Sequence, residues 1–146
     1  MSLQQPVHKM SKSHEDALSR VQLADTPEEV RTKIMAARTD STNAVSYDPE
    51  GRPGVSNLLD ILSALDGAGK SPEVLAQEMT GAGLRALKVR TADAVVEGLA
   101  GVRDRYLDAL SRRQGDYLND VAEAGASRAR ANADETMAAV RAAVGL

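Results

Sequence analysis

Apolar residues recur every three or four positions in two stretches of the first half of the chain, which is the spacing of one helix face. The first stretch predicts a helix from Thr26, as N-cap, to about Arg38. Its start has a proline at the first helical position and two acids at the positive end of the helix dipole. These residues are Pro27, Glu28 and Glu29, and the predicted buried face holds Val30, Ile34 and Ala37.

The second stretch predicts a helix that opens at Gly54 or Ser56 and ends before Gly67-Ala68-Gly69. Its apolar residues are Val55, Leu58, Leu59, Leu62 and Leu65. Ser71-Pro72-Glu73 repeats the cap, proline and acid order, and it predicts a short third helix to about Met79.

The second half of the chain is also predicted to be helical. An apolar stripe runs on from Leu84, with Gly98 and Gly101 as candidate bends. Its members are Leu87, Ala92, Val95, Leu99, Val102, Tyr106 and Leu110. We expect a turn at Gln114-Gly115-Asp116, a short helix over 117–124 and a final helix from about 126 to 144, with Gly145 as its terminal residue. The pattern therefore predicts a mainly α protein.

Two segments lack this periodicity. Residues 1–20 are polar and are expected to form a loop, whereas residues 21–23 alternate and are either a strand remnant or a lead-in to the first helix. The periodicity is also lost between Thr39 and Gly54, where residues 48–54 are dense in turn formers and are expected to form a loop. We therefore divide the chain into a loop segment, 1–22, and a helical domain, 23–146.

Composition limits the kinds of core, metal site and partner that the protein can have. The 146 residues include no Phe and no Trp, so the core must be built from aliphatic residues and Ala, which favours closely packed helices. The absence of Cys excludes disulfides and cysteine-based metal sites, and no metal site is predicted. The apolar runs are too short to span a bilayer, so no membrane partner is expected. A net charge of −3 argues against nonspecific coating of nucleic acid.

Five residues of the N-terminal loop are the main candidates for chemistry: Lys9, Met10, Ser11, Lys12 and Ser13. Two ammonium groups on a flexible loop suit a polyphosphate, because they can follow negative charge that develops on a leaving group. The alternative interpretation is an ordinary solvated polar stretch.

These residues spell KMSKS, a signature of class I aminoacyl-tRNA synthetases, and the rest of the chain resembles bacterial and mitochondrial tryptophanyl-tRNA synthetases in order and spacing. The segments that carry the resemblance are 25–29, Thr39-Asp40-Ser41, Tyr47-Asp48-Pro49, the most family-specific stretch 53–59, and the C-terminal stretch from Gly125-Ala126 through Thr136-Met137 to 144–146. His14 departs from the family, which commonly has an acid at that position.

The resemblance implies tryptophan–tRNA ligation, in which tryptophan attacks the α-phosphate of ATP, bound with Mg²⁺, and the adenylate then esterifies tryptophan tRNA. Lys9 and Lys12 would be the catalytic residues that neutralise charge on pyrophosphate. Met10, Ser11 and Ser13 would complete the ATP-binding loop, with Met10 as its anchor. Residues 23–146 would be the helical anticodon-binding domain, and residues 1–22 a remnant of the nucleotide-binding, Rossmann-like domain. The resemblance also implies a homodimeric family, with most of the dimer interface outside this sequence, and the mitochondrial matrix or, alternatively, the cytoplasm of a bacterium.

The family's HIGH-like signature and its tryptophan pocket have no counterpart among these residues. The first hypothesis is therefore a C-terminal part of a tryptophan–tRNA ligase that is inactive alone. The alternative is a free-standing, non-catalytic helical tRNA-binding or interaction module. Candidates for tRNA contacts are Arg112, Arg113, Arg128 and Arg130, although Asp108 and Arg112 also have the spacing of an ordinary ion pair on a helix surface.

Overall fold

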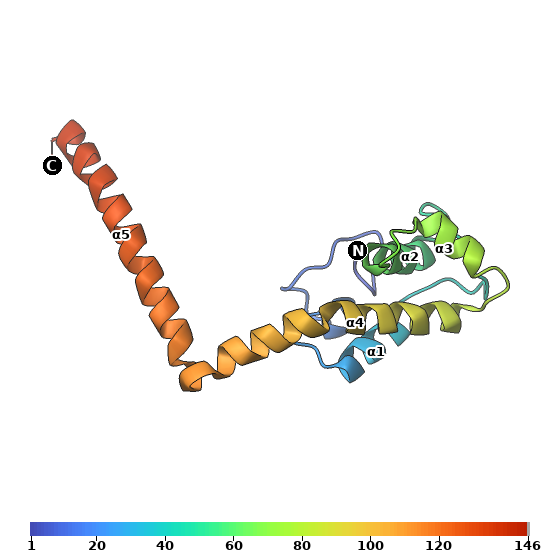
Figure 1. Cartoon of the computed structure of the whole chain (residues 1–146). Coiled ribbons are helices and arrows are strands. Elements are labelled where there is room, and N and C mark those ends of the chain that lie inside the picture. Colours follow the sequence, from blue (N-terminus) through green and yellow to red (C-terminus); the bar gives the residue numbers. More distant parts are fainter. Residues whose placement is uncertain (146) are drawn as a thin grey trace. The chain divides into compact units, whose positions relative to one another are not determined.

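The computed structural model describes residues 1–145, and every regular element in that range is helical (Figure 1). The elements are the 3-10 turn η1 (Ala17–Ser19), the helices α1 (Pro27–Met35), α2 (Pro53–Leu65), α3 (Pro72–Glu78) and α4 (Leu84–Ser111), the 3-10 turn η2 (Arg112–Gly115) and the helix α5 (Asp116–Val144). The predicted mainly α class is confirmed.

The chain divides into two compact units, Met1–Arg103 and Asp104–Leu146. The first unit contains the N-terminal segment, α1, α2, α3 and the first part of α4, and it holds the hydrophobic core. The second unit contains the end of α4, η2 and α5. The boundary predicted at residue 22 concerns the domains of the parent family, and it stays a prediction.

The core of the first unit combines apolar side chains of all four helices with one residue of the N-terminal segment, Leu3. The most enclosed apolar members are Leu3, Ile34, Val55, Leu58, Leu59, Leu75 and Leu87. The predicted buried face of α1 is confirmed, because Val30, Ile34 and Ala37 all belong to this core. Lys88 of α4 crosses to the end of α1, where its Nζ donates to the carbonyl oxygen of Ala37 at 2.8 Å.

α1 begins where the sequence predicts. Thr26 and Glu29 form a capping box, in which the Thr26 hydroxyl accepts from the Glu29 amide and the Glu29 carboxylate accepts from the Thr26 amide. The helix ends at Met35, three residues before the predicted end. The helix ends early because the Arg38 amide donates to the carbonyl oxygen of Leu3, at 2.8 Å, instead of to a carbonyl oxygen of α1.

α2 begins at Pro53, slightly earlier than predicted, since proline is well suited to the first helical position. The residue that follows has to be glycine. A Cβ at Gly54 would lie 2.3 Å from the carbonyl oxygen of Arg38, so only a residue without a side chain lets this turn approach the chain after α1.

The predictions for the remaining helices are partly wrong. α3 matches its predicted start, and α4 continues through Gly98 and Gly101 as one helix. α5 is also one helix where the sequence suggested two, because a single Gly125 between alanines costs only about 1 kcal/mol and does not break a helix. Gly145 caps α5 in the left-handed conformation, as predicted.

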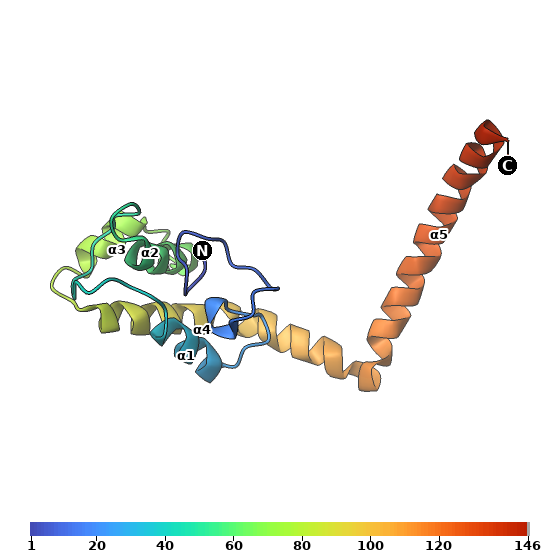
Figure 2. The same ribbon diagram turned by 180° about the vertical axis from the view of Figure 1, so that it is seen from behind.

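Of the two alternatives for residues 21–23, the strand is wrong and the lead-in to α1 agrees with the structure. The N-terminal segment that precedes them runs as an irregular path with the short turn η1 (Figure 2, dark blue). The stripe of α4 is buried only in its first half, since Val102, Tyr106 and Leu110 are exposed. No residue of α5 is buried within the described range. None of the described helices combines the length and apolar character needed to cross a bilayer.

Candidate functional site

In the loop of Lys9 to Ser13 the charged side chains are exposed and the apolar side chain is partly buried. Lys9, Lys12 and Ser13 are exposed, whereas Met10 is half-buried and packs against the core of the first unit. The Met10 side chain thus ties the loop to the core, and the lysines on either side of it remain accessible. Long ammonium side chains on such a loop can reach phosphate oxygens without first breaking other contacts.

A tight turn follows the first serine of this loop. The hydroxyl oxygens of Ser11 and Ser13 lie 3.1 Å apart, and the His14 amide donates to the carbonyl oxygen of Ser11 at 3.2 Å. The imidazole Nδ1 of His14 accepts from the Asp16 amide at 3.1 Å. The His14 side chain therefore accepts a hydrogen bond within its own loop.

A neighbouring backbone segment fixes both ends of the loop. The Ser2 amide donates to the carbonyl oxygen of His8 at 2.7 Å, directly before the lysines. The Leu3 amide donates to the carbonyl oxygen of Ser19 at 2.9 Å, after the loop has returned. Leu3 and Ser19 are each only 1% exposed, so the loop projects from buried and hydrogen-bonded positions.

The returning side of the loop is braced by Arg20. Its Nη1 donates to the carbonyl oxygens of His14 at 2.8 Å and Asp16 at 3.2 Å. The Asp16 carboxylate in turn caps η1 by accepting from the Leu18 amide at 2.8 Å. The stretch that carries the two lysines therefore lies between positions that are hydrogen-bonded on both sides.

A cleft of about 430 Å³ lies beside the start of this loop. Its walls come from the N-terminal residues 4–8, the chain that follows α1 and the first two residues of α2. Those lining residues include His8, Arg38 and Asp40. A larger cleft, of about 1070 Å³, is lined by residues of α2 and α4 and of the loops before and after α2 and before α4, and it includes none of the five candidate residues.

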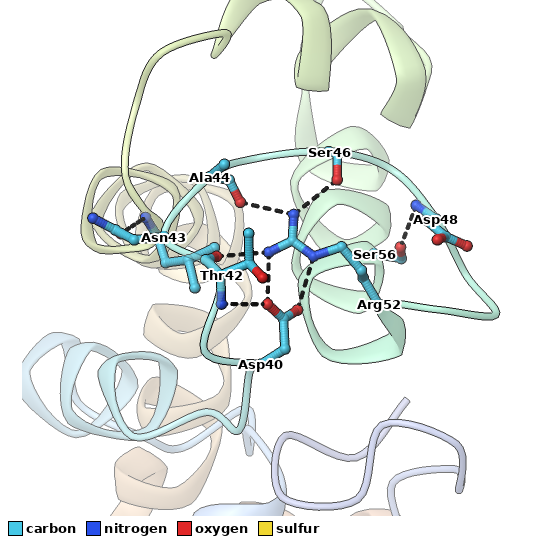
Figure 3. Close-up of polar contacts among 9 residues, drawn as sticks. Asp40, Thr42, Asn43, Ala44, Ser46, Asp48, Arg52 and Ser56 are labelled. Carbon is cyan, nitrogen blue, oxygen red and sulfur yellow. Dashed lines mark hydrogen bonds and ion pairs between the residues drawn. The ribbon is translucent and has the colours of Figure 1, made fainter.

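Arg52 organises the chain that forms one wall of the smaller cleft (Figure 3). Its guanidinium donates to both carboxylate oxygens of Asp40, at 2.9 and 2.8 Å. The same group donates to the carbonyl oxygens of Thr42 at 2.8 Å and Ala44 at 2.9 Å, and to the Ser46 hydroxyl at 2.7 Å. The hydrogen bonds from Arg52 hold the pKa of Asp40 below its ordinary value.

The loop that Arg52 holds, between α1 and α2, also forms hydrogen bonds with two helices (Figure 3). The side-chain oxygen of Asn43 accepts from the Leu84 amide at 3.0 Å, and so it caps the start of α4 from a distant part of the chain. The Asp48 amide donates to the Ser56 hydroxyl of α2 at 2.9 Å. Local patterns gave no sign of Arg52 or Asn43, because their partners lie many residues away.

The arginines suggested for tRNA contact have different surroundings within the second unit. Arg112 forms an ion pair with Asp108 at 2.7 Å and lies over the ring of Tyr117, and Arg113 pairs with Asp120. Arg128 and Arg130 are exposed on α5. The alternative of ordinary surface pairing therefore describes Arg112 and Arg113.

Comparison with known proteins identifies the family to which the chain belongs. Residues 1–100 match the family described as tRNA synthetases class I (W and Y), and the chain belongs to that family. Over 146 residues it is 47% identical to tryptophan–tRNA ligase 1 of Streptomyces avermitilis, and 39% identical to the tryptophan–tRNA ligase of Enterococcus faecalis. Both alignments cover 100% of this chain and 42% of the relative, so the chain spans less than half the length of the relatives it matches.

A solved structure supports the same relationship. The crystal structure of tryptophanyl-tRNA synthetase from Mycoplasma pneumoniae superimposes with a TM-score of 0.74 and 31% sequence identity. The match covers 100% of this chain and 43% of the other. The recognised resemblance to tryptophanyl-tRNA synthetases is thereby confirmed over the whole chain.

Proposed function

We propose that this chain serves ATP-dependent ligation of tryptophan to its tRNA, and that its loop of Lys9 to Ser13 binds the phosphates of ATP. The observation that carries the proposal is the loop itself, with two exposed ammonium groups between backbone positions fixed by Ser2 and Leu3. Membership of the class I family and the named relatives supports the choice of reaction.

The loop suits the activation step because pyrophosphate gains negative charge as tryptophan attacks the α-phosphate. Lys9 and Lys12 would approach the β- and γ-phosphates, and their attraction would grow as that charge develops. Mg²⁺ would arrive with ATP and be held mainly by phosphate oxygens and water. The hydroxyls of Ser11 and Ser13 can donate to phosphate oxygens once they exchange their mutual contact for the ligand.

The helical remainder supports a second part of the proposal, namely contact with tryptophan tRNA. Anticodon bases are unpaired and can be splayed against a protein surface, so a helical unit can read them without entering a duplex groove. Arg128 and Arg130 are exposed cations of α5 that are available for backbone contacts. Homodimerisation and the mitochondrial matrix, with the bacterial cytoplasm as the alternative, stay predictions from the resemblance.

The phosphate role is tested by calorimetric titration of the chain with ATP and Mg²⁺. The double variant Lys9→Gln/Lys12→Gln is expected to weaken binding by at least about tenfold, because it removes both charge-assisted contacts. Arg85→Gln, at an exposed cation of α4, is the control and should leave the affinity within about twofold of wild type. Equal affinities of the double variant and the control would refute the phosphate role.

A further inference from the structure

A buried side chain of α2 contacts the segment that fixes the candidate loop. Asn57 is 4% exposed, and its side-chain oxygen accepts from the Met1 amine at 2.8 Å. Its side-chain nitrogen lies 3.3 Å from the carbonyl oxygens of both Met1 and Ser2 and donates toward them. Its hydrogen-bonding groups are thus directed at two adjacent residues more than fifty positions earlier in the chain.

The position is unusual for an asparagine. Asparagine is a weak helix former, and a buried amide is favourable only when its polar atoms are paired. A hydrophobic residue at this position would pack in α2 with the surrounding leucines, but it could not hold a backbone segment. We therefore infer that the Asn57 amide holds Met1 and Ser2 in place and does not stabilise α2 itself.

The held segment connects directly to the loop. The Ser2 amide donates to His8, one residue before Lys9, and the Leu3 amide donates to Ser19, after the loop. Asn57 thus hydrogen-bonds to the Ser2 carbonyl group, and the amides on either side of that carbonyl, those of Ser2 and Leu3, bond to the two ends of the loop. Removing the amide would loosen the segment on which both of these bonds depend, although Leu3 would keep its core packing and its bond from the Arg38 amide.

We propose that Asn57 is a positioning residue, which holds the Ser2–Leu3 backbone and thereby sets the placement and freedom of the Lys9–Ser13 loop. Its importance for ATP rests on the proposed function, whereas its effect on the loop does not require any ligand. The side chain itself touches neither the lysines nor the expected position of phosphate.

The first test is limited trypsin digestion of the full chain without ligand, with the sites identified by mass spectrometry. Cleavage after Lys9 and Lys12 reports opening of the loop, and cleavage after Lys33, a buried residue of α1, reports unfolding of the first unit. Asn57→Ala is expected to accelerate cleavage after Lys9 and Lys12 about tenfold, which corresponds to about 1.4 kcal/mol of local stability.

The control is Ser56→Ala. Ser56 is the adjacent buried polar residue of α2 (2% exposed), but its hydroxyl accepts from the Asp48 amide rather than bonding to the N-terminal segment. It should change cleavage after Lys33 about as much as Asn57→Ala does, and it should leave the two loop sites near the wild-type rate. Equal acceleration of the loop sites in both variants would show a general packing role and overturn the proposal.

A second variant covers the case in which Asn57→Ala does not fold. Asn57→Asp keeps an acceptor for the Met1 amine and loses the donor to Met1 and Ser2. It should still speed cleavage at the loop sites several-fold, and amide exchange of Leu3 should rise with it. A wild-type rate at both the loop sites and the Leu3 amide would contradict the proposal.

Titration with ATP and Mg²⁺ separates this inference from the proposed function. If wild type binds ATP, Asn57→Ala should weaken binding less than Lys9→Gln/Lys12→Gln does, because the lysines remain present. If wild type does not bind ATP, the phosphate role fails, while faster cleavage in Asn57→Ala still establishes Asn57 as the residue that holds the loop.

Discussion

Arg52 donates hydrogen bonds to both carboxylate oxygens of Asp40, a residue twelve positions earlier, and so closes the connection between α1 and α2 (Figure 3). The guanidinium uses its other donors on Thr42, Ala44 and Ser46. One planar side chain thereby orders a loop that contains no regular structure of its own.

Replacing this arginine with lysine should destabilise the protein although the charge is kept. Arg52→Lys loses the paired contact with Asp40 and several carbonyl contacts, since an ammonium group cannot match the planar fork. We expect a loss of about 1–3 kcal/mol in the free energy of unfolding, measured with urea. Arg85→Lys, at an exposed position, is the control and should change it by less than about 0.5 kcal/mol.

The same pair predicts a pH dependence. Arg52 lowers the pKa of Asp40 below its ordinary value of 3.8, so the folded state favours the ionised carboxylate. Its contribution is fully present above that ordinary pKa, and it is lost as the pH falls through the lower pKa of the folded state. Urea unfolding from pH 6 to pH 2.5 should show this loss in wild type and a smaller one in Asp40→Asn. Identical pH profiles would contradict the role given to the pair.

Gly54 should tolerate no side chain. In Gly54→Ala the new Cβ would lie 2.3 Å from the Arg38 carbonyl oxygen, so either α2 or the chain after α1 must move. We expect a loss of about 1–3 kcal/mol in thermal or urea unfolding. Gly67→Ala is the matched control in the same unit, because its Cβ would meet no atom within 4 Å. A wild-type stability for Gly54→Ala would show that the close approach is not required.

The sequence could predict features that depend on neighbouring residues, but not those that depend on contacts between distant ones. The starts of α1 and α3 were predictable because Thr26 and Ser71 are local signals with a proline beside them. The early end of α1 was not, since it depends on the bond between Arg38 and Leu3. The KMSKS residues identified the candidate site by their order alone, whereas its supporting contacts involve distant partners that no local spacing reveals.

The two pairs of arginines in the second unit should differ in their contribution to tRNA binding. Arg128→Gln/Arg130→Gln should weaken binding of the chain to tryptophan tRNA and reduce the slope of its salt dependence by about 1–2. Arg112→Gln/Arg113→Gln should have less effect, since these groups already pair with Asp108 and Asp120. Filter binding across a salt series measures both slopes. The opposite order would contradict the assignment of α5 to the tRNA.

Binding of ATP at the lysine loop can be observed residue by residue through amide chemical-shift mapping. A ¹⁵N-labelled chain titrated with ATP and Mg²⁺ should show its largest shift changes at residues 8–14, and these should vanish in Lys9→Gln/Lys12→Gln. Largest changes at the residues that line the 1070 Å³ cleft, such as Val89 and Ala94, or no saturable changes at the loop, would contradict ATP binding at the lysines.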